Sequence, residues 1–171
     1  MPHWRRYYIP NALIFITTVT CDRRPILGND RNVQLLFDTM TAVQIIHPFH
    51  LLAYVILPDH VHFLMRTDPP TTFSQAMQSI KGNYTVEYKK ANGITSSLTL
   101  WQHRFWDHVI RDELDLARHM DYIHYNPVKH KCASSPSQWQ YSTFAFWAER
   151  GYYDPTWGSD MPTNIAHMEM E

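Results

Sequence analysis

The sequence has little cysteine and no long hydrophobic run. Its 171 residues include two cysteines, Cys21 and Cys132, and neither belongs to a CxxC pair. This usage predicts a reduced, cytoplasmic protein with structural thiols. No stretch approaches the roughly 18 to 20 apolar residues that cross a bilayer, and residues 1–6 have no apolar signal core behind them. We therefore expect neither a membrane-spanning protein nor a secreted one.

The sequence also lacks the net positive charge of a general nucleic-acid binder. The formal net charge is −1 at pH 7. Residues 1–90 nevertheless hold 9 Lys and Arg against 6 Asp and Glu, whereas residues 91–171 hold 6 against 10. The basic excess lies mostly at Arg5–Arg6 and Arg23–Arg24, beside aromatic residues. This pattern favours a local basic patch over bulk attraction to nucleic acid.

A histidine pair marks the most informative stretch, residues 57–65. His60 and His62 lie two residues apart within an apolar run. In a strand, residues i and i+2 point to the same face, so the two side chains would project side by side, about 7 Å apart along the backbone. Two imidazoles at this spacing can bind one metal ion. Two hydrogen-bonded polar residues at a strand end would have the same pattern.

The alternation of strand and helix patterns predicts an α+β fold. The predicted strands are residues 13–20, 49–57, 61–67 and 104–110. The predicted helices are 31–47, capped by Asp30, then 73–91, with a capping box at Thr72 and Gln75, and 112–125. This order fits a ferredoxin-like split βαβ layer with an added C-terminal helix. In that fold the first and third strands are central and adjacent, so the histidine pair would stand on a central strand.

The length favours one domain over residues 1–171, with its core within about 4–147 and a loose tail at 160–171. Residues 139–147 are too aromatic to lie free in water. We expect them to pack back on the body of the protein as a short helix or an irregular segment.

The third predicted helix carries a second informative pattern. Leu116, Met120 and Ile123 form an apolar stripe that should face the protein. Tyr122 and Asn126, four residues apart, share a side off that stripe, so we expect Tyr122 to face a cleft or solvent. Pro127 follows directly and should end the helix.

The histidine pair and this helix together favour phosphoryl-transfer chemistry. His60, His62 and the carbonyl oxygen of Asn126 would hold a divalent ion with open positions, and a mixed nitrogen and oxygen site suits Mg²⁺ or Mn²⁺. Such an ion can polarise a phosphoryl oxygen. Tyr122 is then a candidate nucleophile whose product is a covalent phosphotyrosine. A metal-dependent phosphoesterase that uses water is an alternative for the same residues.

These motifs resemble those of a known group of proteins. His60-Val61-His62 resembles the histidine–hydrophobic–histidine motif of the HUH endonucleases. Residues 121–130 look like the tyrosine helix of the REP-associated tyrosine transposases, and segments 4–9, 57–60 and 101–108 also look like that group. The resemblance extends from about residue 4 to residue 147.

The resemblance implies a metal-dependent single-stranded DNA endonuclease and transposase that acts on REP palindromes, which are short hairpins with a conserved tetranucleotide at the 5′ foot. It implies that Tyr122 takes the 5′ phosphate and that His60 and His62 bind the metal. Asn126 is the implied third ligand, and His124 is the alternative. The expected DNA contacts are Arg5, Arg6, Tyr7, Arg23, Arg24 and Arg104. A hairpin-binding protein that does not cleave is the rival interpretation, and both a monomer and a homodimer remain open.

Overall fold

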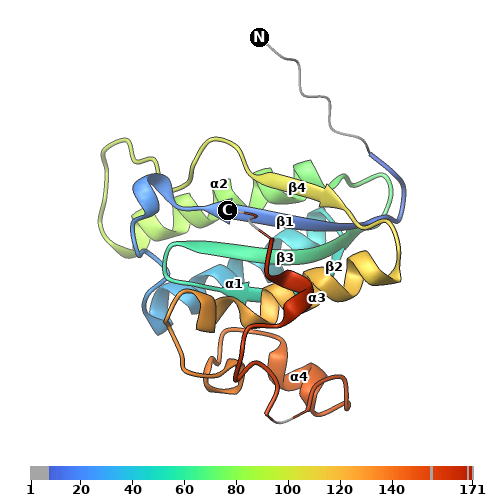
Figure 1. Cartoon of the computed structure of the whole chain (residues 1–171). Coiled ribbons are helices and arrows are strands. Elements are labelled where there is room, and N and C mark those ends of the chain that lie inside the picture. The colour runs from blue at the N-terminus through green and yellow to red at the C-terminus, as the bar shows by residue number, and fades with distance from the viewer. Residues whose placement is uncertain (1–7, 155, 169, 171) are drawn as a thin grey trace.

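A four-stranded antiparallel sheet forms the centre of the computed structural model, which describes residues 8–154, 156–168 and 170 (Figure 1). The strand order is β2-β3-β1-β4. The strands are β1 (Leu13–Val19), β2 (Phe49–Ile56), β3 (His60–Thr67) and β4 (Trp106–Val109). β1 and β3 are thus central and adjacent, and the predicted ferredoxin-like fold class is confirmed.

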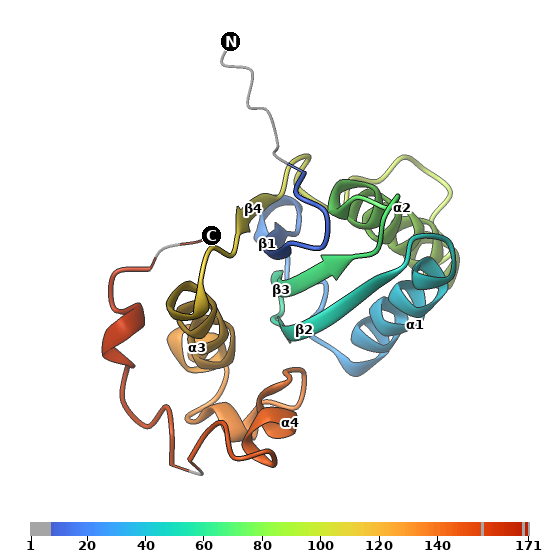
Figure 2. The same ribbon diagram turned by 90° about the vertical axis from the view of Figure 1, so that its right-hand side faces the viewer.

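Helices cover both faces of this sheet. α1 (Asp30–Ile46) and α2 (Phe73–Ala91) lie on one face, and α3 (Glu113–Lys129) lies on the other (Figure 2). Successive β1 side chains alternate between the two faces, so Ile14 and Ile16 join the core beneath α1 and α2, whereas Phe15 joins the core beneath α3. A strand buried on both sides explains why β1 contains no charged residue and no alternation of apolar and exposed polar residues.

The helix starts follow from their capping side chains. At α2, the Thr72 hydroxyl accepts from the Gln75 N–H, and the Gln75 side chain accepts from the Thr72 N–H, so the predicted capping box is confirmed. The prediction that Asp30 caps α1 is wrong by one residue. Asn29 has an extended backbone and accepts from the Asn32 N–H at 3.0 Å, whereas Asp30 is already helical.

α3 continues through Pro127 to Lys129, so the prediction that the proline ends the helix is wrong. Pro127 is itself buried, and the turn after it is closed by two backbone bonds, from His130 N–H to the Asn126 carbonyl and from Cys132 N–H to the Pro127 carbonyl. Tertiary packing and these bonds offset the cost of a proline that stands this close to a helix end. The extra turn carries Lys129, which contributes to the site described below.

The segment after α3 packs back on the body of the protein, as predicted for residues 139–147. The indole N–H groups of Trp139 and Trp147 donate to the β2 carbonyls of Ile56 and Leu52. Short helical segments in the chain are α4 (Phe144–Ala148) and the 3₁₀ turns Cys21–Arg23, Pro136–Gln138 and Thr163–Ile165. Within the predicted tail, Ile165 is buried in the α3 core.

In the described part of the chain, we find no helix that combines the length and the apolar character needed to cross a bilayer.

Candidate functional site

The histidine pair is buried at the start of the central strand β3. His60 and His62 are both fully covered and lie on the face of the sheet that packs against α3. The register pairs His60 with Val19 and His62 with Thr17 of β1. The two rings meet edge to face with centroids 4.9 Å apart. A rigid central strand therefore holds two imidazoles side by side.

Each histidine has its Nδ1 atom engaged by a neighbouring side chain. Nδ1 of His60 lies 2.6 Å from the Asp59 carboxylate, and Nδ1 of His62 lies 2.8 Å from the Thr17 hydroxyl. Because the Thr17 hydroxyl donates its hydrogen to the Met170 carbonyl, we assign it as the acceptor from His62. Both histidines then carry the proton on Nδ1 and present an Nε2 lone pair. Metal-binding histidines commonly have this arrangement, in which a hydrogen bond at one ring nitrogen fixes the tautomer and leaves the other nitrogen to the ion.

Asp59 is fixed by an ion pair as well as by His60. Arg23 donates to its second carboxylate oxygen at 3.1 Å. Burial alone would raise the pKa of the Asp59 carboxyl, but the bonds from His60 and Arg23 outweigh it and hold that pKa below its ordinary value. Asp59 is therefore an ionised acceptor that orients His60. The adjacency of Asp59 to His60 is the only signal for this role in the sequence.

Tyr122 extends from α3 toward the histidine pair. Its ring lies 5.3 Å from the His62 ring and 5.9 Å from that of Phe15, and only 2% of the residue is exposed. The prediction that Tyr122 faces a cleft or solvent is therefore wrong. His119 and Asn126 are also buried on this side of α3, which shows that this side faces the sheet. The polar character of this buried side is what misled the apolar-stripe argument.

Lys129 approaches the tyrosine from the last turn of α3. Its ammonium donates to the Tyr122 hydroxyl at 3.1 Å and lies 4.8 Å from the centre of the ring. A positive charge at this position stabilises negative charge on the phenolic oxygen. Sequence reasoning missed Lys129 because Pro127 was expected to end the helix before it.

Asn126 meets the histidine pair from the same helix. Its Oδ1 atom lies 3.4 Å from Nε2 of His60, and the residue is fully buried. This separation is compatible with two ligands of a single ion at about 2.1 Å from each. His130, which sequence reasoning did not single out, brings its ring within 4.8 Å of the His60 ring.

His124, the alternative third ligand, faces away from His60. Its two ring nitrogens contact the Tyr153 hydroxyl at 2.8 Å and the Thr143 hydroxyl at 2.9 Å. Burial lowers the pKa of His124 to about 3, so the ring is neutral at physiological pH. The structure thus brings together His60, His62, Tyr122 and Asn126, and it leaves His124 in a separate contact that ties α3 to the C-terminal segment.

A second cluster fixes the start of α3 on β4. The Asp115 carboxylate contacts His108 at 2.8 Å and His119 at 3.3 Å, and it accepts from the backbone and guanidinium of Arg111. Burial raises the pKa of the Asp115 carboxyl, but the bonds from His108 and Arg111 reverse this and hold the pKa well below its ordinary value. The three potential ligand atoms lie within 4.8 Å of one another, as a metal site would require. The Arg111 cation already bonds to this carboxylate, so the cluster is best described as an anchor for the tyrosine helix.

The predicted DNA-binding arginines lie in different environments. Arg23 pairs with Asp59, and Arg24 donates to the backbone carbonyls of Cys21 and Thr99, which makes Arg24 a structural residue of its loop. Arg104 is exposed in the segment that leads into β4. Arg5, Arg6 and Tyr7 lie outside the described residues.

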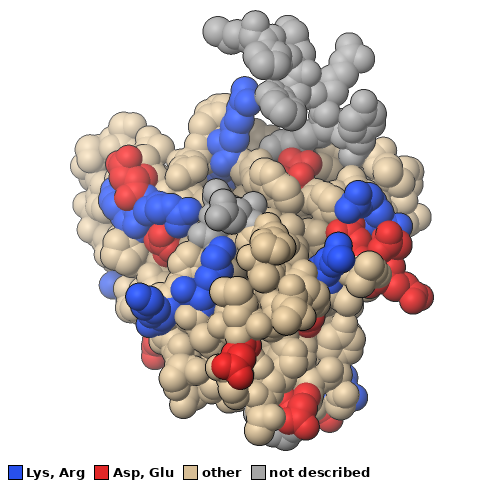
Figure 3. Space-filling model, viewed as in Figure 1, with Lys and Arg blue, Asp and Glu red and all other residues tan. Residues whose placement is uncertain are grey.

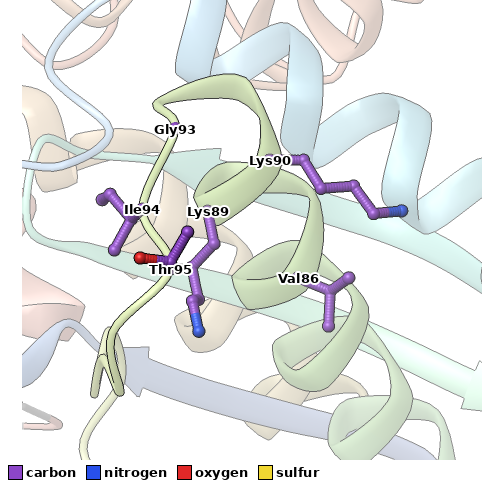
Figure 4. Close-up of a pocket in the computed structure, with 6 residues that line it drawn as sticks. All are labelled: Val86, Lys89, Lys90, Gly93, Ile94 and Thr95. Atoms are coloured by element: carbon purple, nitrogen blue, oxygen red, sulfur yellow. The ribbon is translucent and has the colours of Figure 1, made fainter.

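The surface charge on the α3 face is mixed. Figure 3 shows Lys and Arg side chains spread over this face with Asp and Glu among them. A separate hollow of about 390 Å³ lies at the end of α2, on the opposite side of the sheet, between Val86 and Ile94 and beside Lys89 and Lys90 (Figure 4). That hollow is therefore not part of the histidine and tyrosine site.

A ferredoxin-like sheet that holds a His-hydrophobic-His pair against a helical tyrosine defines a single-tyrosine transposase of the HUH class. The family described as Transposase IS200 like matches residues 9–126, and the chain belongs to this family.

The individual relatives of this chain point to one group within the family. A REP-associated tyrosine transposase of Escherichia coli K12 is 35% identical over 162 residues, which span 94% of this chain and 93% of the relative. A Haemophilus influenzae relative is 32% identical over 173 residues, with coverages of 96% and 98%. A solved structure of a REP-associated tyrosine transposase bound to a REP hairpin is 34% identical, with a TM-score of 0.82 and coverages of 99% and 96%. The resemblance drawn from the motifs is thereby confirmed.

Proposed function

We propose that this transposase cleaves and rejoins single-stranded DNA at REP-type hairpins through a covalent 5′-phosphotyrosine on Tyr122. The observation that carries the proposal is the contact between Tyr122 and both His62 and Lys129, beside the Asn126–His60 pair. The relative solved with a REP hairpin supports the choice of DNA. Since the proposed substrate is DNA, we infer that the protein acts in the cytoplasm.

A divalent ion fits the donor atoms at this site. Nε2 of His60, Nε2 of His62 and Oδ1 of Asn126 would hold it, and this mixed set suits Mg²⁺ or Mn²⁺ better than a metal that prefers thiolates. When bound, such an ion polarises a non-bridging oxygen of the scissile phosphate. Asp59 and Thr17 keep the two rings in the tautomer that leaves Nε2 available.

The residues of the chain supply the rest of the chemistry. The Tyr122 oxygen attacks the phosphorus, so a bond from oxygen to phosphorus forms while the bond from phosphorus to the 3′ oxygen breaks. The phenolic proton leaves to solvent, and the departing 3′ oxygen gains a proton from water. The Lys129 ammonium, 3.1 Å from the phenolic oxygen, stabilises its developing negative charge. The reverse reaction, with a 3′ hydroxyl as the attacking group, rejoins the strand and releases Tyr122.

The rival function is hairpin binding without cleavage, and one experiment separates the two. The substrate is a library of single-stranded hairpins that carry one label at the 5′ end and another at the 3′ end. The protein is incubated with this library in the presence of Mn²⁺ and is then separated on a denaturing protein gel. We expect transfer of the 3′-labelled fragment to wild-type protein and none to Tyr122→Phe. Tight binding without transfer, for every sequence and metal tried, would favour the binding protein.

A further inference from the structure

Trp106 lies at the edge of the sheet on the same face as the histidine pair. It is the first residue of β4, and the register pairs it with Thr17, which on its other side pairs with His62. Directly paired residues of antiparallel strands share a face, so Trp106, Thr17 and His62 form one row across three strands. Because strands lie about 4.8 Å apart, Trp106 stands about 10 Å from His62 along this row.

A stack of rings holds the indole from one side. The His108 ring lies 5.9 Å from the indole at an interplanar angle of 9°, and the His119 ring continues the stack at 4.8 Å and 13°. Phe15 meets Trp106 edge to face at 5.6 Å. Since Asp115 bonds to both His108 and His119, the stack is anchored to α3. The orientation of the indole is therefore set before any ligand arrives.

Trp106 remains exposed despite these contacts. Its exposed fraction is 42%, whereas Trp101, a core residue, is 6% exposed. A rigid, exposed indole is the kind of surface on which unpaired bases stack, because every base has a π face. The exposed Arg104, two residues earlier, adds a guanidinium for the phosphate backbone.

We propose that Trp106 is the stacking site for one unpaired base of the single-stranded foot of the hairpin, next to the scissile phosphate. The inference rests on the proposed function, which places that phosphate at Tyr122 and the histidine pair. A DNA strand that runs along the row from Trp106 to His62 crosses Thr17.

The test measures binding of two fluorescent DNA probes in the absence of cleavage. One is a REP-type stem–loop with an unpaired four-nucleotide 5′ foot, and the other is the same stem–loop with a blunt end. The proteins are wild type, Trp106→Ala, Trp106→Phe and the control Phe146→Ala. Phe146 is a matched control because it is an aromatic residue 47% exposed on α4. Abasic residues placed at each foot position in turn identify the base that stacks.

We expect Trp106→Ala to weaken binding of the footed probe by about tenfold or more. Trp106→Ala should bind the blunt probe nearly as well as wild type does. Trp106→Phe and Phe146→Ala should bind the footed probe with nearly wild-type affinity. An abasic residue at one foot position should weaken binding of the footed probe to wild type by a similar factor. The same abasic residue should hardly change binding to Trp106→Ala, because the base and the indole act as a coupled pair. Equal binding of the footed probe by wild type and Trp106→Ala would overturn the inference, and so would an equal loss with both probes.

The failure of this inference can be distinguished from failure of the proposed function. A phosphotyrosine adduct on Tyr122 without any effect of Trp106 on the footed probe rejects the stacking site alone. If Trp106→Ala loses affinity for the footed probe alone, and wild type forms no phosphotyrosine adduct, the covalent mechanism is rejected and the stacking site is retained.

Discussion

Two residues outside the proposed set of metal ligands orient the histidine pair. Asp59 and Thr17 each occupy an Nδ1 atom, so the Nε2 atoms of His60 and His62 are the ones available to an ion. Such outer partners fix ring orientation and raise the basicity of the ligand. The histidines could be found in the sequence from their i, i+2 spacing, whereas Thr17 could not, because only the pairing of β1 with β3 brings it to His62.

Replacing Asp59 by Asn should therefore weaken metal binding. The amide keeps the shape of the carboxylate but loses its charge, and we expect the dissociation constant for Mn²⁺ to rise about 10- to 100-fold. Electron paramagnetic resonance of free Mn²⁺ measures this without any DNA. Asp22→Asn, an exposed acid in the neighbouring loop, serves as the control. Unchanged Mn²⁺ affinity in Asp59→Asn would contradict the role given to this carboxylate.

Lys129 should matter for the rate of cleavage more than for DNA binding. Removing its ammonium leaves the developing charge on the Tyr122 oxygen without this donor, so we expect Lys129→Ala to lower the single-turnover cleavage rate by about 10²-fold. Lys129→Arg should restore part of the rate. Lys131→Ala, an exposed lysine two residues later, should keep the wild-type rate. A wild-type rate in Lys129→Ala would remove this residue from the mechanism.

At the scale of elements, α3 is the helix that was predicted least accurately from the sequence. The strands and the Thr72–Gln75 capping box could be predicted because they depend on local side chains. The buried side of α3 could not, since it carries Asp115, His119, Tyr122 and Asn126 in place of aliphatic residues. Local sequence rules fail at functional sites, where buried polar groups are retained for their chemistry.

The anchor at Asp115 should contribute to stability, because its buried carboxylate joins β4 to α3. We expect Asp115→Ala to lower the free energy of unfolding by about 3 kcal/mol at pH 7, since it leaves His108 and Arg111 without their acceptor. Asp112→Ala, which removes only the N-cap of α3, should cost about 1 kcal/mol. Urea denaturation followed by circular dichroism gives both values.

The contribution of the Asp115 carboxylate to the free energy of unfolding should also decrease as the pH falls. The folded-state pKa of this carboxyl lies below its unfolded value of about 3.9, so its stabilisation is fully present above that pH and is lost as the pH falls toward the folded pKa. The difference in stability between wild type and Asp115→Ala should therefore shrink between pH 5 and pH 3. A difference that grows on acidification would contradict the ionised anchor.

At the scale of the whole molecule, α3 packs on the sheet of its own chain, so one chain supplies both the tyrosine and the histidine pair. We therefore expect a mixture of Tyr122→Phe and His60→Ala/His62→Ala proteins to remain inactive in cleavage of a hairpin substrate. Restored cleavage in the mixture would show that the tyrosine of one chain serves the histidines of another. The sequence alone left this open, because the loop before α3 does not reveal where the helix docks.

The most direct test of the central claim is mass spectrometry of the protein after reaction with a cleavable hairpin and Mn²⁺. We expect a peptide that contains Tyr122 to carry a nucleotide through a phosphodiester bond, and Tyr122→Phe to lack every such adduct. An adduct on another residue, or cleavage that persists in Tyr122→Phe, would contradict the assignment of Tyr122 as the nucleophile.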